Sequence, residues 1–169
     1  MQHPSNGFQT QEQFELHHLR MNVLRRTAWL LGPLGLVPFV ALSVALWLVD
    51  GRIQPMLAQA LLLYSVCIIS FLGGIHWGIA LVFHEMPAVY VVTALVWSVL
   101  PALAAWPLAL LPIGQALAWA AVLLLVVLAV DLRLNRHYPL PLWFASLRST
   151  LTAVACTSLL LAWMQVAGR

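Results

Sequence analysis

Long apolar runs, interrupted by short clusters of charged, proline and glycine residues, dominate the pattern along this chain. Each run is close to the roughly 20 residues that a helix needs to cross the hydrocarbon core of a bilayer. Because an open strand would leave backbone groups without partners in lipid, these runs must form helices. The pattern predicts an all-α polytopic membrane helix bundle of about five transmembrane helices, over residues 27–49, 55–83, 88–111, 113–130 and 142–166.

The boundary between the third and fourth helices has the weakest signal, because the turn around Pro112 and Gly114 carries no charge. An interpretation with four helices, one of them long and broken, therefore stays open. Prolines also fall inside predicted helices, at Pro38, Pro101 and Pro107. Each removes an intrahelical hydrogen bond, so we expect kinks that packing tolerates rather than a substrate path of broken helices.

Composition supports a membrane location. The chain has 169 residues, of which 63% are hydrophobic and 8% are charged, whereas a soluble domain has about 25% charged residues. The first 26 residues are polar and lack the cationic start and cleavage site of a secretory signal. We predict a polar cytoplasmic segment over residues 1–26, in which residues 11–26 form either an interfacial helix or a disordered tail. Residues 27–169 then form a single transmembrane domain.

The basic residues are all arginines, and with five crossings they fall mostly on one side of the membrane. That side holds Arg20, Arg25, Arg26, Arg133, Arg136 and Arg148, and the other holds Arg52 and Arg169. The positive-inside rule then places the N-terminus in the cytoplasm and the C-terminus in the periplasm. We expect a multi-pass protein of the cell inner membrane, or of the mitochondrial inner membrane in a eukaryote.

Small residues follow one face of the second predicted helix. At about 100° per residue, Cys67, Ser70, Gly74 and Gly78 form a single stripe. The spacing of Gly74 and Gly78 is one that lets two helix backbones approach closely. We therefore predict a helix-packing role for these four residues and a central place for this helix in the bundle.

His76, on another face of the same helix, is the histidine that lies well inside a predicted span. It is either a neutral structural residue bonded to a carbonyl or serine, or a ligand contact or proton acceptor. A haem would need a second axial histidine. His84 is turned by about 80° from His76 on a straight helix, so we expect no cofactor here.

Asp131, at the end of the fourth helix, and Arg148, in the second turn of the fifth, lie near the same membrane boundary. They form either a structural clamp or the basis of an anion or headgroup site. We hypothesise that they pair, that His76 faces the same space, and that His76, Trp77, Asp131 and Arg148 form a ligand-binding site in the cytoplasmic half. The deeper tryptophans are expected mainly to pack or to face lipid: Trp77, Trp97, Trp106 and Trp119.

Other chemistry has no sequence support. We find no nucleophile–base pair, phosphate loop or paired carboxylates, so an enzyme is not expected. Cys67 and Cys156 lie inside predicted helices and have no metal-ligand spacing, so no metal is expected. The net charge of +3 comes mostly from arginines that set topology, and no basic stripe with interleaved aromatics indicates nucleic-acid binding.

Several short sequence motifs occur in an order that resembles a known membrane family. They are Gly35-Leu-Val-Pro-Phe39, the segment from Ser70 to Gly78, Leu100-Pro-Ala-Leu103, Asp131, Leu140-Pro-Leu-Trp-Phe144, Leu147-Arg148 and Leu151-Thr152. The chain resembles, over about residues 30–160, the family that includes mitochondrial transmembrane protein 69, known as domain of unknown function 3429. The resemblance implies a multi-pass protein of a bacterial or mitochondrial inner membrane and supplies no activity.

Two classes of function stay open. The first is a non-catalytic protein that helps to assemble or stabilise a membrane complex. Its partners would be membrane lipids and either another membrane protein or a second copy of this chain. The second is a protein that binds or moves a small amphiphile, such as a lipid or quinone, near His76 and Arg148. A partner role predicts tolerance of changes at His76, whereas a ligand role predicts a pocket on the cytoplasmic side.

Overall fold

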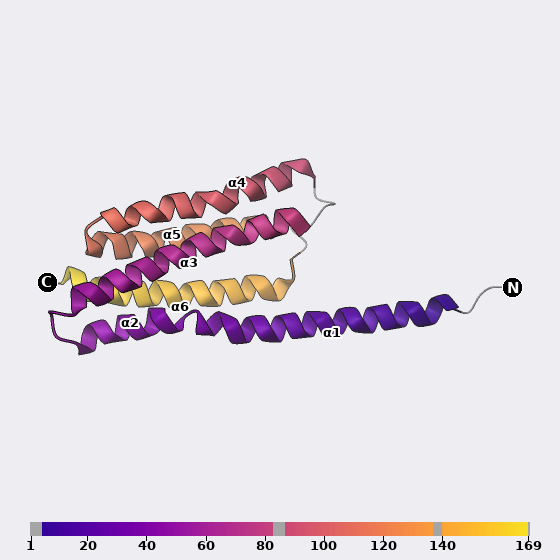
Figure 1. Cartoon of the computed structure of the whole chain (residues 1–169), viewed down its shortest axis with the longest axis horizontal. Coiled ribbons are helices and arrows are strands. Elements are labelled where there is room, and N and C mark those ends of the chain that lie inside the picture. The colour runs from indigo at the N-terminus through magenta and orange to yellow at the C-terminus, as the bar shows by residue number, and fades with distance from the viewer. Residues whose placement is uncertain (1–4, 83–86, 137–139, 169) are drawn as a thin grey trace. The chain divides into compact units, whose positions relative to one another are not determined.

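The computed structural model describes residues 5–82, 87–136 and 140–168, and in these ranges it is helical with no strand. This confirms the all-α prediction. Figure 1 shows the elements in chain order: α1 (Ser5–Leu34), α2 (Val37–Leu48), α3 (Gln54–Val82), α4 (Ala88–Ala105), the 3₁₀ helix η1 (Trp106–Leu110), α5 (Ile113–Leu134) and α6 (Leu142–Ala167). The chain divides into two compact units, residues 1–35 and residues 36–169.

The first unit contains α1, which runs as one helix from the polar N-terminal segment into the first apolar run. The helix therefore continues across residue 27, where the predicted first transmembrane helix was expected to begin. The predicted first helix over 27–49 is also divided, since α1 ends at Leu34 and α2 begins at Val37. Pro38 lies in the first turn of α2, where its missing N–H leaves no helical hydrogen bond unmade.

Five helical segments are long and apolar enough to cross a membrane: His18–Leu48, Gln54–Val82, Ala88–Leu110, Ile113–Leu134 and Leu142–Ala167. This agrees with the prediction of a multi-pass protein and disfavours the interpretation with four helices. The third segment changes from α4 to η1 at Trp106, and Pro107 lies in the first turn of η1 rather than inside an α-helix. The predicted end of the second helix, Phe83, lies outside the described residues.

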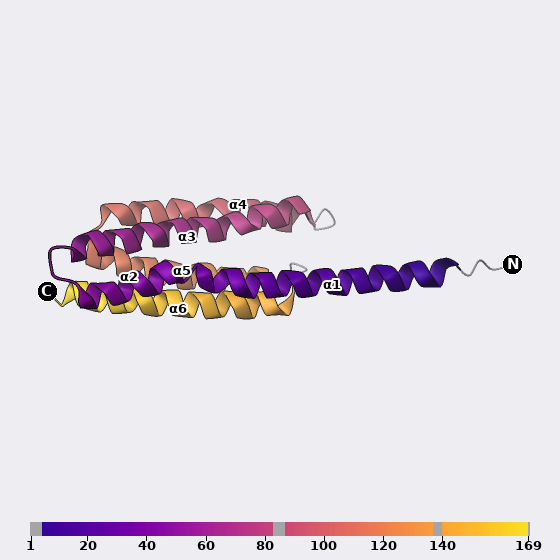
Figure 2. The ribbon, with the colours of Figure 1, turned by 60° about the horizontal axis from the view of Figure 1, so that its bottom comes forward.

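The second unit is a helix bundle with α3 near its centre. α3 packs mainly on α4, α5 packs on α6, and α2 contacts both α3 and α6 (Figure 2). α3 also contacts α5 and α6, which agrees with the central place predicted for it. The core contains Phe39, Leu61, Ile69, Leu124 and Leu159, whose side chains are almost completely buried.

At Gly73 the backbone of α3 lies very close to α4. A Cβ at Gly73 would lie 2.6 Å from the carbonyl oxygen of Ser98 and 3.1 Å from Cγ of Pro101. Real Cβ atoms essentially never come so near to another heavy atom. Only glycine therefore fits at position 73 without a shift of one of the two helices.

The predicted helix-packing role of Cys67, Ser70, Gly74 and Gly78 is wrong within this chain. A Cβ at Gly74 or Gly78 would meet nothing within 4 Å, Cys67 is exposed, and the hydroxyl of Ser70 donates to the carbonyl of Val66 in its own helix. Adjacent residues on a helix differ by about 100° in direction. Because Gly73 faces α4, the stripe that contains Gly74 faces outward.

Candidate functional site

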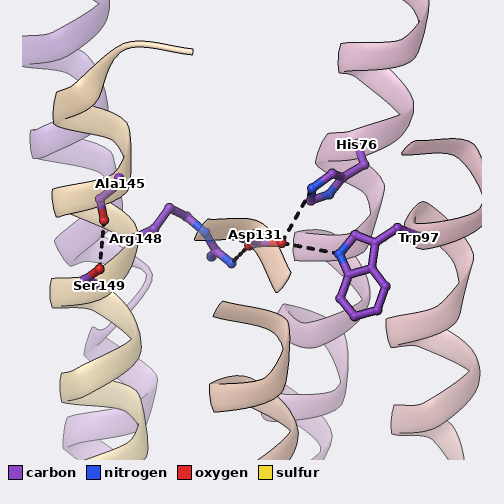
Figure 3. A network of polar contacts seen from close by, with 6 residues as sticks. All are labelled: His76, Trp97, Asp131, Ala145, Arg148 and Ser149. Atoms are coloured by element: carbon purple, nitrogen blue, oxygen red, sulfur yellow. Dashed lines mark hydrogen bonds and ion pairs between the residues drawn. The ribbon is translucent and has the colours of Figure 1, made fainter. Parts of the chain in front are cut away.

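One carboxylate joins four helices of the bundle. Figure 3 shows the side chains of His76 from α3, Trp97 from α4 and Arg148 from α6 directed toward Asp131 on α5. We call these four residues the Asp131 cluster. All of them lie in the part of the bundle near the end of α5 and the start of α6.

Arg148 and Asp131 form the central ion pair. Nη2 of Arg148 donates to Oδ2 of Asp131, which is the pairing predicted from the sequence. Their side chains are only 6% and 10% exposed. A charge at such depth needs a partner, because removing it from water costs several kcal/mol. With about 1.5 Å of rise per residue, Arg148 lies about 9 Å into its helix, and His76 lies at a similar depth from the end of α3.

The second carboxylate oxygen has two weaker contacts. Nε1 of Trp97 donates to Oδ1 of Asp131 over 3.4 Å, and Nε2 of His76 lies 3.5 Å from the same oxygen. Both distances exceed the usual 2.7–3.2 Å of an N–H···O hydrogen bond, so we expect the arginine contact to dominate.

The location of the tryptophans differs from the sequence hypothesis. Trp77 is 50% exposed and does not reach the cluster, because His76 points inward and its neighbour is turned by about 100°. Trp97 takes the place expected of Trp77. An indole N–H inside a bundle needs a hydrogen-bond acceptor. This requirement was the one sequence feature that could have indicated a contact between a tryptophan and Asp131. The sequence alone does not say which face of the third predicted span is turned toward Asp131.

A small pocket adjoins the cluster between α5 and α6. Its volume is about 10 Å³, and it is lined by Asp131, Leu132, Asn135, Phe144, Ala145 and Arg148. This is room for about one water molecule, whereas sites for drug-sized ligands have about 300–1,000 Å³. A larger cavity of about 190 Å³ lies at the opposite end of the bundle, lined by Gly51, Gln54, Pro55, Ala58, Ile113 and Val166.

The described residues contain no group of three or more His, Cys, Asp and Glu side chains that could hold a metal ion. His84, the other candidate for a haem ligand, lies outside the described residues. The cluster therefore offers one ion pair, one imidazole and one indole as its polar groups. These groups can hold a carboxylate in place or move a proton at the imidazole, and they form no nucleophilic pair.

Residues 24–164 match the profile of a family described as "Protein of unknown function (DUF3429)". The chain belongs to this family. Transmembrane protein 69 of Xenopus tropicalis is 41% identical to it over 140 residues, which are 79% of this chain and 52% of that protein. Transmembrane protein 69 of Mus musculus is 34% identical over 128 residues, which are 73% of this chain and 50% of that protein. No solved structure matches the chain significantly.

The family match covers all four residues of the Asp131 cluster. The chain spans about half the length of the curated relatives it matches. The relatives' names support a multi-pass membrane protein, as the sequence resemblance implies.

Proposed function

We propose that this protein has a non-catalytic role and helps to assemble or stabilise a membrane complex. The occupied state of the Asp131 carboxylate supports the proposal. Both oxygens of the Asp131 carboxylate have partners from the same chain, and the adjoining pocket has a volume of only about 10 Å³. A substrate at this place would have to displace Arg148 from a buried ion pair, which is costly.

In this proposal the Asp131 cluster has a structural role and holds helices of the same chain together. Four helices meet at one carboxylate, so the charge of Asp131 is neutralised inside the bundle and the outer surface is left for lipid and protein neighbours. The partner would be a transmembrane helix of another membrane protein. The outward face of α3 at Gly74 and Gly78 has room for a second backbone, and such small residues favour close helix contacts in membranes.

We also propose an inner-membrane location with the N-terminus in the cytoplasm. Arg20, Arg25 and Arg26 are exposed on α1, and Arg133 and Arg136 are exposed at the end of α5. With five crossings these ends lie on one side, and the positive-inside rule favours the cytoplasm. A reporter that is active only in the cytoplasm should be silent when it is fused after Arg169, and an active reporter there would reverse the orientation.

Native mass spectrometry of the protein extracted with its own lipids tests the role itself. We expect a co-purifying membrane protein that is retained by the control Ala104→Leu, an exposed position on α4, and lost in Gly74→Leu. A loss of about tenfold in recovery corresponds to about 1.4 kcal/mol of binding free energy.

Two results would contradict the proposal. Retention of the same partner in Gly74→Leu would exclude the face of α3 as the contact. A stoichiometric lipid or quinone without any protein partner would instead favour the amphiphile-binding class, and the gap between α5 and α6 would then have to open around Arg148.

A further inference from the structure

Two polar atoms beside the Asp131 cluster are buried without a hydrogen bond to any residue that the structure describes. They are Nε of Arg148 on α6 and Oδ1 of Asn135, the residue that directly follows α5. Buried polar groups are almost always paired with protein or with ordered water. These two atoms therefore need a partner.

Both residues line the same pocket between α5 and α6. The rest of its wall is largely apolar, with Leu132, Phe144 and Ala145, so these side chains offer no competing hydrogen bond. Arg148 is only 5% exposed, and bulk solvent does not satisfy its Nε–H. The pocket thus brings together one donor, one acceptor and a space of about 10 Å³.

We propose that this pocket binds one water molecule, which accepts a hydrogen bond from Nε–H of Arg148 and donates one to Oδ1 of Asn135. The volume matches the minimum for one water, about 10–15 Å³. A water both donates and accepts, so it serves the Asn135 amide in either orientation. This inference does not depend on the proposed function.

A larger or charged ligand fits this place less well. A phosphate headgroup exceeds the volume of the pocket, and the charge of Arg148 is already neutralised by Asp131. The water would instead complete the solvation of the guanidinium, with Nη2 bound to Asp131 and Nε bound to the water. It would link the buried ion pair to the end of α5 through Asn135.

Nuclear magnetic resonance of the full chain in lipid nanodiscs tests the site, with ¹⁵N-labelled arginine. The Nε–H resonance of Arg148 is identified by its absence in Arg148→Lys. We expect magnetisation transfer from water to this Nε–H. Asn135→Leu fills the pocket and should abolish the transfer, whereas Asn135→Ser keeps a polar group and leaves space, so the transfer should persist.

Ala145→Val fills the same pocket from α6 and should give the same loss, so the test does not depend on the folding of one variant. Three results would overturn the proposal. They are no water transfer in the native protein, unchanged transfer in both filled variants, and a contact from another side chain at Nε–H in place of water.

Discussion

Replacing Arg148 with alanine is expected to lower the free energy of unfolding by about 3–5 kcal/mol, because Asp131 would remain as an uncompensated buried charge. Asp131→Ala should lower the free energy of unfolding by about the same amount, because Arg148 would then remain as the uncompensated buried charge. Both side chains are at most 10% exposed and contact each other directly. The loss can be measured as a shift in denaturant or thermal unfolding in a matched detergent or bicelle.

The double variant Asp131→Ala/Arg148→Ala separates a buried pair from two independent effects. Because it removes both charges together, it should be much less destabilised than the sum of the single variants. His76→Gln should cost only about 0.5–1.5 kcal/mol, since its contact with Asp131 is long at 3.5 Å. Additive losses in the double variant, or a cost below 1 kcal/mol for both single variants, would show that the pair is not coupled.

The pair of Asp131 and Arg148 could be predicted from the sequence because few partners exist for a charge in an apolar span. Counting residues from the helix ends placed both groups near one membrane boundary, and burial then required them to meet. The inward direction of His76 was expected because an ionisable side chain deep in a membrane span usually faces the bundle interior. The four-helix character of the site could not be predicted in the same way, since the contact of Trp97 depends on how α4 is rotated against α5.

Helix boundaries and packing faces were harder to predict for a related reason. Local composition placed the helical segments well, yet the first helix extends far into the polar N-terminal region and divides before Pro38. A run of small residues indicates that two helix backbones can approach closely, but it does not indicate at which glycine they do so. The spacing of small residues favoured Gly74, whereas the packing of α3 on α4 places Gly73 at the close approach.

Gly73→Ala is therefore expected to destabilise the protein by about 1–3 kcal/mol, the usual cost of overpacking. The added methyl group would lie 2.6 Å from the Ser98 carbonyl oxygen. That oxygen belongs to the backbone of α4 and cannot rotate away as a side chain can. One helix must shift, and the side chains between α3 and α4 lose contacts. The measurement is again unfolding of the purified protein in one detergent or bicelle.

Gly74→Ala is the matched control, with the same substitution one residue away in the same helix. Its Cβ would meet nothing within 4 Å, and alanine is favoured over glycine inside helices by about 0.8–1.0 kcal/mol. The variant should therefore be as stable as the native chain or slightly more so. A larger loss for Gly74→Ala than for Gly73→Ala would mean that α3 is rotated by about one residue from the position described, and His76 would then no longer face Asp131.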